Sequence, residues 1–130
     1  MTNDMQAWLR NTADILRKQW GLSDSFSDRA ALLLAYFFIY GLSPRITSGY
    51  RSEEYQQELA RRYASGDRSV IVKPATNSLH STTTWLGGPA ARAIDVSTSN
   101  PNVAGQIARA LRVGAGLYFK TPDPVHFYQE

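Results

Sequence analysis

The chain has no cysteine among its 130 residues, which excludes a disulfide framework and a thiolate metal site. Its apolar run at residues 30–40 is shorter than the ~20 residues that cross a bilayer, and it predicts a buried helix. Residues 1–5 include an acidic residue and no basic one, unlike a signal peptide. Repeats, low-complexity tracts and linkers are also lacking. We therefore expect one domain made in the cytosol, so that any action outside the cell requires another exit route.

Net charge is small, at +3 with an isoelectric point near 9.4. This balance mildly favours anionic partners, such as nucleic acid or the acidic bacterial cell wall, but an ordinary solvated surface explains it equally well. No run of lysines and arginines marks a nucleic-acid-binding arm. A hydrophobic fraction of 43% is enough for a packed core and argues against a disordered chain.

Apolar residues at helical spacing predict four helices, with glycines at their ends and serine or asparagine caps at their starts. The second helix is apolar nearly all round, so we expect it at the centre of the core. In the fourth helix, Val103, Ile107 and Leu111 form the expected buried stripe. The predicted helices cover residues 3–20, from Ser25 or Ser27 to Tyr40, from Ser52 to about Gly66, and from Asn100 to the glycines at 114 and 116.

Short segments rich in β-branched and aromatic residues predict strands. Helices that come first, followed by several such strands, indicate an α+β fold. We expect a small, mostly antiparallel sheet that carries the functional site and packs against the N-terminal helices. The predicted strands lie at residues 45–48, 69–73, 92–97, 117–120 and 125–128.

The two histidines of the chain are His80 and His126, and Asp95 lies between them in the apolar segment 93–96. Two imidazoles and one carboxylate suit Zn²⁺ and leave its fourth tetrahedral position open, as in catalytic zinc sites. Asp123 adds a second carboxylate next to the second histidine, in a half of the chain where acidic residues are scarce. The pattern therefore favours a metal site.

These residues also have a simpler explanation. A single histidine in a strand is more often a hydrogen-bonded core residue than a metal ligand. Asp95 fits that explanation less well, because a buried carboxylate is costly without a partner, and a metal ion is the simplest partner. The residues alone favour a metal without excluding a structural role.

Four short motifs strengthen the metal interpretation. In their order along the chain they resemble the zinc D-Ala-D-Ala metallopeptidases and the phage L-alanyl-D-glutamate endopeptidases, which share a superfamily with lysostaphin and the hedgehog signalling domain. The resemblance covers roughly residues 34–128. The motifs are Ser48-Gly49-Tyr50-Arg51-Ser52, Ser78 and His80 followed by Ala93, Asp95 and Val96, then Gly114-Ala115-Gly116-Leu117-Tyr118, and Asp123-Pro124-Val125-His126-Phe127.

The resemblance implies that His80, Asp95 and His126 bind zinc. It also implies that Asp123 is the general base. Arg51 would face the substrate and either polarise the scissile carbonyl or bind a carboxylate. The simpler alternative for Arg51 is an ordinary surface charge.

Three further residues are candidate substrate contacts. Tyr50 and Ser78 could orient ligands or substrate, although a turn-forming role explains them equally well. Residues 81–91 lengthen the connection that the family has between its first histidine and the aspartate, and we expect a hairpin or lid there. Trp85 in this insertion either contacts substrate or serves as a hydrophobic plug. A longer connection is tolerated between ligands, so the insertion bears on specificity more than on metal binding.

The resemblance implies zinc-dependent hydrolysis of the peptidoglycan stem peptide, with no nucleic-acid or membrane partner. The Asp-x-x-His-Phe ending favours a phage endolysin that cuts the L-Ala–D-Glu bond in the periplasm or cell wall, as a monomer or within a larger phage assembly. One alternative is a D-Ala-D-Ala carboxypeptidase or dipeptidase, and another is a non-catalytic zinc-stabilised virion module. A small nucleic-acid binder is the third, and it rests on charge alone.

Overall fold

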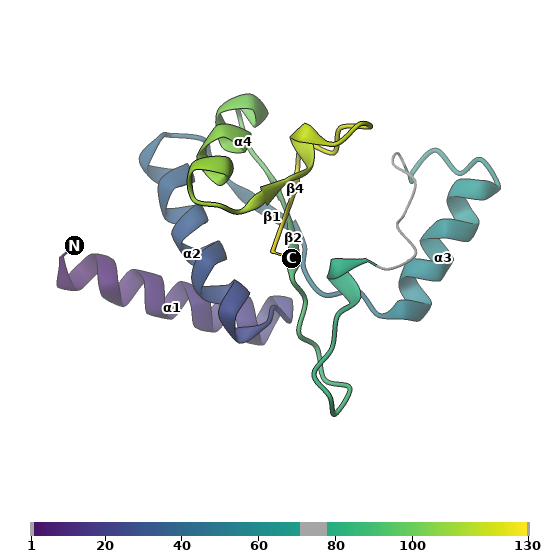
Figure 1. Cartoon of the computed structure of the whole chain (residues 1–130), viewed down its shortest axis with the longest axis horizontal. Helices are drawn as coiled ribbons and strands as arrows, with labels where there is room; N and C mark the ends of the chain where they lie inside the picture. Colours follow the sequence, from purple (N-terminus) through teal and green to yellow (C-terminus); the bar gives the residue numbers. More distant parts are fainter. Residues whose placement is uncertain (1, 71–77, 130) are drawn as a thin grey trace.

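The computed structural model describes residues 2–70 and 78–129, which form one sheet with helices around it (Figure 1). The predicted α+β class is confirmed, because the described helices and strands share a single architecture with the longest helices at the N-terminus. In chain order the elements are α1 (Asn3–Trp20), α2 (Asp24–Ile39), β1 (Arg45–Ser48), α3 (Glu53–Ala64), the 3₁₀ turn η1 (Leu79–Ser81), β2 (Ala93–Ser97), α4 (Pro101–Ala110), β3 (Gly114–Ala115), the 3₁₀ turn η2 (Gly116–Tyr118) and β4 (His126–Tyr128).

The sheet has the strand order β1-β2-β4-β3, and each neighbouring pair is antiparallel. β2 therefore lies between β1 and β4, although 28 residues separate the end of β2 from the start of β4. The register places Asp95 opposite His126 on one side and opposite Ser48 on the other. Residues from three distant segments thus meet at the centre of the sheet.

One face of the sheet is apolar and packs against the helices. Ile94 and Phe127 are almost fully buried, and the ring of Phe127 lies 5.4 Å from the ring of Phe37 in α2. Side chains alternate between the two faces of a strand. Asp95 and His126 therefore project from the other face, and the packing of their neighbours holds them there.

The helices begin near the predicted positions, with one correction. Ser52 and Asn100 cap α3 and α4 as expected. The second helix is capped by Ser23, so neither Ser25 nor Ser27 is its cap. The Ser27 side chain is buried instead, and its hydroxyl donates to the backbone carbonyl of Ser23 at 2.7 Å. In the described ranges, no helix combines the length and apolarity needed to cross a membrane.

The predicted strand at residues 117–120 is wrong, because residues 116–118 form the turn η2. The third strand is instead β3, formed by residues expected to end the fourth helix, and it pairs with β4. Gly114 allows this pairing, because a Cβ there would lie 2.4 Å from the ring of Tyr128. In the predicted strand 69–73, Ser69 lies in a turn, and residues 71–73 fall outside the described residues.

The buried face of α4 differs slightly from the predicted stripe. Val103, Ile107 and Leu111 are only partly buried and flank the core. The residues that reach the core are smaller: Ala104 and Ala108 are fully buried, with Gly105 between them. A Cβ on Gly105 would lie 2.4 Å from a methyl group of Leu117, so the helix needs small residues to pack this closely.

The 81–91 insertion forms the expected hairpin, which projects away from the sheet (Figure 1). Thr83 and Pro89 form an antiparallel bridge, and Thr84 donates its backbone N–H to the carbonyl of Gly88 at 2.8 Å. Trp85 is 92% exposed near the tip, so it is not a hydrophobic plug. Its predicted substrate contact remains a prediction.

Candidate metal centre

His80, Asp95 and His126 converge on the open face of the sheet. Asp95 comes from β2 and His126 from β4, whereas His80 lies on the 3₁₀ turn η1. His80 Nε2 lies 3.1 Å from Asp95 Oδ1 and 3.2 Å from His126 Nδ1, and the third side of this triangle is also 3.2 Å. The predicted trio therefore forms one compact cluster that could hold a metal ion.

Hydrogen bonds to both the backbone and the ring hold His80 in place. Ser78 caps η1, and its Oγ accepts the backbone N–H of His80 at 3.1 Å. The carbonyl oxygen of Gly49 lies 2.7 Å from Nδ1, and because a carbonyl can only accept, Nδ1 carries the proton. With the proton on Nδ1, Nε2 is the ring nitrogen of His80 that could bind a metal ion.

The donor set fits a divalent metal. Two imidazole nitrogens and a carboxylate oxygen meet at one spot, and a cation bound there would be a shared partner for all three atoms. Ligands held 2.0–2.1 Å from a tetrahedral Zn²⁺ lie roughly 3.3 Å from each other. The observed separations of 3.1 to 3.2 Å are close to that spacing. The cluster therefore has the chemistry and size of a three-residue metal site.

Asp95 is buried and held ionised by its surroundings. Burial raises the pKa of its carboxyl, but contacts with the His126 and His80 imidazoles and the charge of Arg51 outweigh this effect, and the pKa falls well below its usual range. Its Oδ1 faces the histidines, while its Oδ2 accepts from Arg51 Nη2 at 2.7 Å. One oxygen of Asp95 is therefore directed at the metal position and the other is anchored.

Arg51 is not an ordinary surface charge. Its Nη2 pairs with Asp95, and its Nε donates to Ser48 Oγ at 2.9 Å. Ser48 pairs with Asp95 across the β1–β2 ladder, so the strand register brings all three together. In this structure Arg51 supports Asp95, a candidate metal ligand, and the predicted contact with substrate remains a prediction.

Asp123 lies in the loop before β4, near enough to the cluster for its carboxyl to interact electrostatically with Asp95 and both histidines. Burial and the negative charge of Asp95 raise the pKa of its carboxyl, and the nearby imidazoles and Arg51 partly oppose that rise. Its backbone N–H donates to the Gly116 carbonyl at 2.9 Å, and its carbonyl accepts from the backbone N–H of His126 at 3.1 Å. The loop thus places a carboxylate beside the three ligand atoms with an affinity for protons above that of an exposed aspartate.

Some residues of the site were not identified from the sequence as part of it. Phe119 and Tyr128 place their rings 5.8 and 5.5 Å from the ring of His126, and Tyr128 is stacked on it. The alternation of side chains along β4 was a usable signal for Tyr128, which lies two residues after His126 on the same face. No feature of the sequence indicated that Phe119 belongs to the site, because residues 117–120 were expected to form a strand.

The remaining predicted residues lie around the site in different ways. Ser78 has the turn-forming role described above, and through it positions His80. Tyr50 donates its backbone N–H to the Trp20 carbonyl at 2.7 Å, and its ring packs at Gly21 after α1. Trp85 shares no contact with the cluster among the described ring pairs and hydrogen bonds. The structure therefore gathers four of the candidates around the metal position: His80, Asp95, His126 and Asp123, with Arg51 behind Asp95.

Gly49 offers a test of this positioning. A Cβ there would lie 2.3 Å from the Trp20 carbonyl oxygen, so Gly49→Ala must shift the segment whose carbonyl holds His80. We expect a loss of roughly 1–3 kcal/mol of unfolding free energy, the usual range for overpacking, together with weaker metal binding. Thermal melting and metal titration measure both effects. Gly88→Ala is the matched control, because its Cβ would lie 3.4 Å from its nearest neighbour, and equal behaviour of the two variants would contradict this account.

A small antiparallel sheet with two histidines and one aspartate clustered on its open face defines an α+β protein with a candidate three-residue metal site. No protein-family model and no curated protein matches the sequence. Among solved structures, the fold is similar to that of the L-Ala D-Glu endopeptidase ChiX from Serratia marcescens, with a TM-score of 0.51 and 21% identity over 100% of this chain and 89% of that one. The resemblance seen in the sequence motifs therefore extends to the fold.

Proposed function

We propose that this protein is a metal-dependent peptidase that cleaves the stem peptide of peptidoglycan. The observation that carries the proposal is the convergence of three ligand atoms with a further carboxylate, Asp123, beside them. The fold that it shares with an L-Ala D-Glu endopeptidase supports the same class of substrate. A structural histidine pair would not need a second, proton-accepting carboxylate next to it.

Each residue of the site has a separate role in the proposed hydrolysis. His80, Asp95 and His126 would hold the metal, which we propose is Zn²⁺, and when bound it supplies a Lewis acid that polarises the scissile carbonyl and acidifies water. Asp123 accepts the proton of the attacking water and returns it to the leaving amine. Its raised pKa makes it a better proton acceptor than an exposed aspartate. Arg51 keeps Asp95 ionised and correctly turned.

Within this class we propose cleavage of the L-Ala–D-Glu bond. The Asp-x-x-His-Phe segment at residues 123–127 and the fold of the Serratia enzyme both support that bond. Peptidoglycan would then be the partner and the cell wall the place of action, during phage lysis or from a phage particle.

Mass spectrometry of digested muropeptides tests this function. Zinc-loaded protein is expected to release the whole stem from D-Glu onward, leaving L-Ala on the glycan, and prior chelation is expected to abolish the release. Loss of only a terminal D-Ala would assign the protein to the carboxypeptidases instead. Intact muropeptides after incubation with a zinc-loaded, folded sample would contradict peptidase activity.

A further inference from the structure

A cleft of about 550 Å³ opens beside the metal centre, a volume typical of ligand sites. Its walls come from the end of α1, the end of β1, the first turn of α3 and the base of the 81–91 hairpin. Two of its lining residues contact metal ligands directly: Arg51 lies 2.7 Å from Asp95, and the Gly49 carbonyl lies 2.7 Å from His80. Arg51 and Gly49 therefore connect the wall of the cleft to two of the candidate metal ligands.

The cleft has a positive, partly aromatic lining. Lys18 and Arg51 contribute the charges, and no aspartate or glutamate occurs among the residues that line it. Arg51 is already paired with Asp95, and Arg17 next along α1 is paired with Asp14. Lys18, in contrast, forms no ion pair with any residue in the described parts of the chain. An anion entering the cleft would therefore meet a cation that has no internal partner.

The cleft also has an apolar surface, although Lys18 itself is exposed. Trp20, Tyr50 and Tyr55 line the same cleft, and Pro89 adds a further apolar surface from the hairpin. The lining as a whole suits an extended ligand that carries both carboxylates and apolar carbon chains.

We propose that this cleft binds the acidic half of the substrate, with Lys18 pairing with a carboxylate of the stem peptide on the D-glutamate side of the scissile bond. This proposal rests on the proposed function, and it adds which side of the scissile bond lies in the cleft. D-Glutamate continues the stem through its side-chain carboxyl, which leaves its own α-carboxylate free. The amine side of the bond is consequently the acidic side, and the only charges offered by the cleft are positive.

Binding to an inactive protein separates this proposal from the proposed activity. Zinc-loaded Asp123→Asn is titrated with a muramyl tripeptide whose stem carboxylates are free and with the same peptide fully amidated. The free acid is expected to bind about two- to fivefold more tightly, the range of a partly exposed ion pair, and the preference should shrink as salt increases. In the double variant with Lys18→Gln the two peptides should bind equally, and Lys18→Arg should restore the preference.

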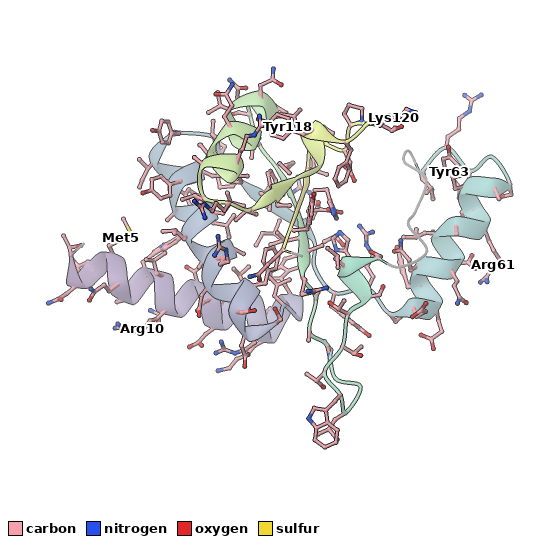
Figure 2. All side chains as sticks on the ribbon, viewed as in Figure 1. Met5, Arg10, Arg61, Tyr63, Tyr118 and Lys120 are labelled. Atoms are coloured by element: carbon pink, nitrogen blue, oxygen red, sulfur yellow. The ribbon has the colours of Figure 1, made fainter. Side chains whose placement is uncertain are left out.

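Arg10→Gln is the matched control, because Arg10 lies on the same helix, points away from the body of the protein (Figure 2) and does not line the cleft. It should keep the full preference for the free acid. Equal binding of the two peptides before any change at Lys18, or a preference that survives Lys18→Gln, would overturn the proposal. Either result can be obtained whether or not the unaltered protein cleaves peptidoglycan, so the two failures are distinguishable.

Discussion

Asp123→Asn is expected to lower kcat on peptidoglycan by about 10²- to 10⁴-fold while the protein keeps its metal. The asparagine side chain has nearly the same shape but cannot accept the proton of the attacking water. The three ligand atoms come from other residues, so their geometry should persist. Steady-state kinetics on a soluble muropeptide and metal analysis of the same sample measure the two properties together.

The matched control for this change is Asp28→Asn, because Asp28 is exposed on α2, far along the chain from the site. It removes the same charge and should leave both kcat and metal content unchanged. A fall in activity of less than about tenfold in Asp123→Asn would show that another group accepts the proton. Loss of the metal would instead place Asp123 among the ligands.

His80→Ala is expected to remove metal binding and the thermal stability that depends on it. At a metal concentration 100 times the Kd, binding to the folded state alone adds about 2.7 kcal/mol. For a domain of this size that corresponds to roughly 10 °C in Tm. The unaltered protein should therefore melt at a higher temperature when zinc is added, and His80→Ala should melt at the same temperature with and without zinc.

The His80→Ala variant also distinguishes the stability that comes from the bound metal from the stability that comes from the hydrogen bonds of His80. His80 is buried and bonded to the Gly49 carbonyl, so its loss lowers the Tm of the metal-free protein too. The informative quantity is the increase in Tm when zinc is added, because the packing lost with His80 lowers the Tm with zinc and the Tm without zinc equally. An increment that persists in His80→Ala, and in Asp95→Ala beside it, would contradict a site formed by these residues.

Several site residues could be predicted because their chemistry is unusual in this sequence. Only two histidines are present, and an aspartate inside an apolar strand needs a partner. Those facts identified His80, Asp95 and His126 without any knowledge of their distances. The α+β class followed in the same way, because helix and strand periodicities dominate long segments.

The contacts around these residues could not be predicted in the same way. Arg51 meets Asp95 through a strand register that shifts between Ile46 and Ser48, and such an irregularity has no clear mark in the sequence. The two-residue strand β3 was missed because its glycine was read as a helix terminator, whereas its role is to make room for Tyr128. Both errors concern tertiary contacts that override local propensity.

Metal content and muropeptide products, measured on the same preparations of the unaltered protein and Asp123→Asn, test the account most directly. We predict about one zinc ion per chain in both proteins, with cleavage at L-Ala–D-Glu only in the unaltered one. Metal-free protein that still cleaves peptidoglycan, or equal cleavage by Asp123→Asn, would contradict it.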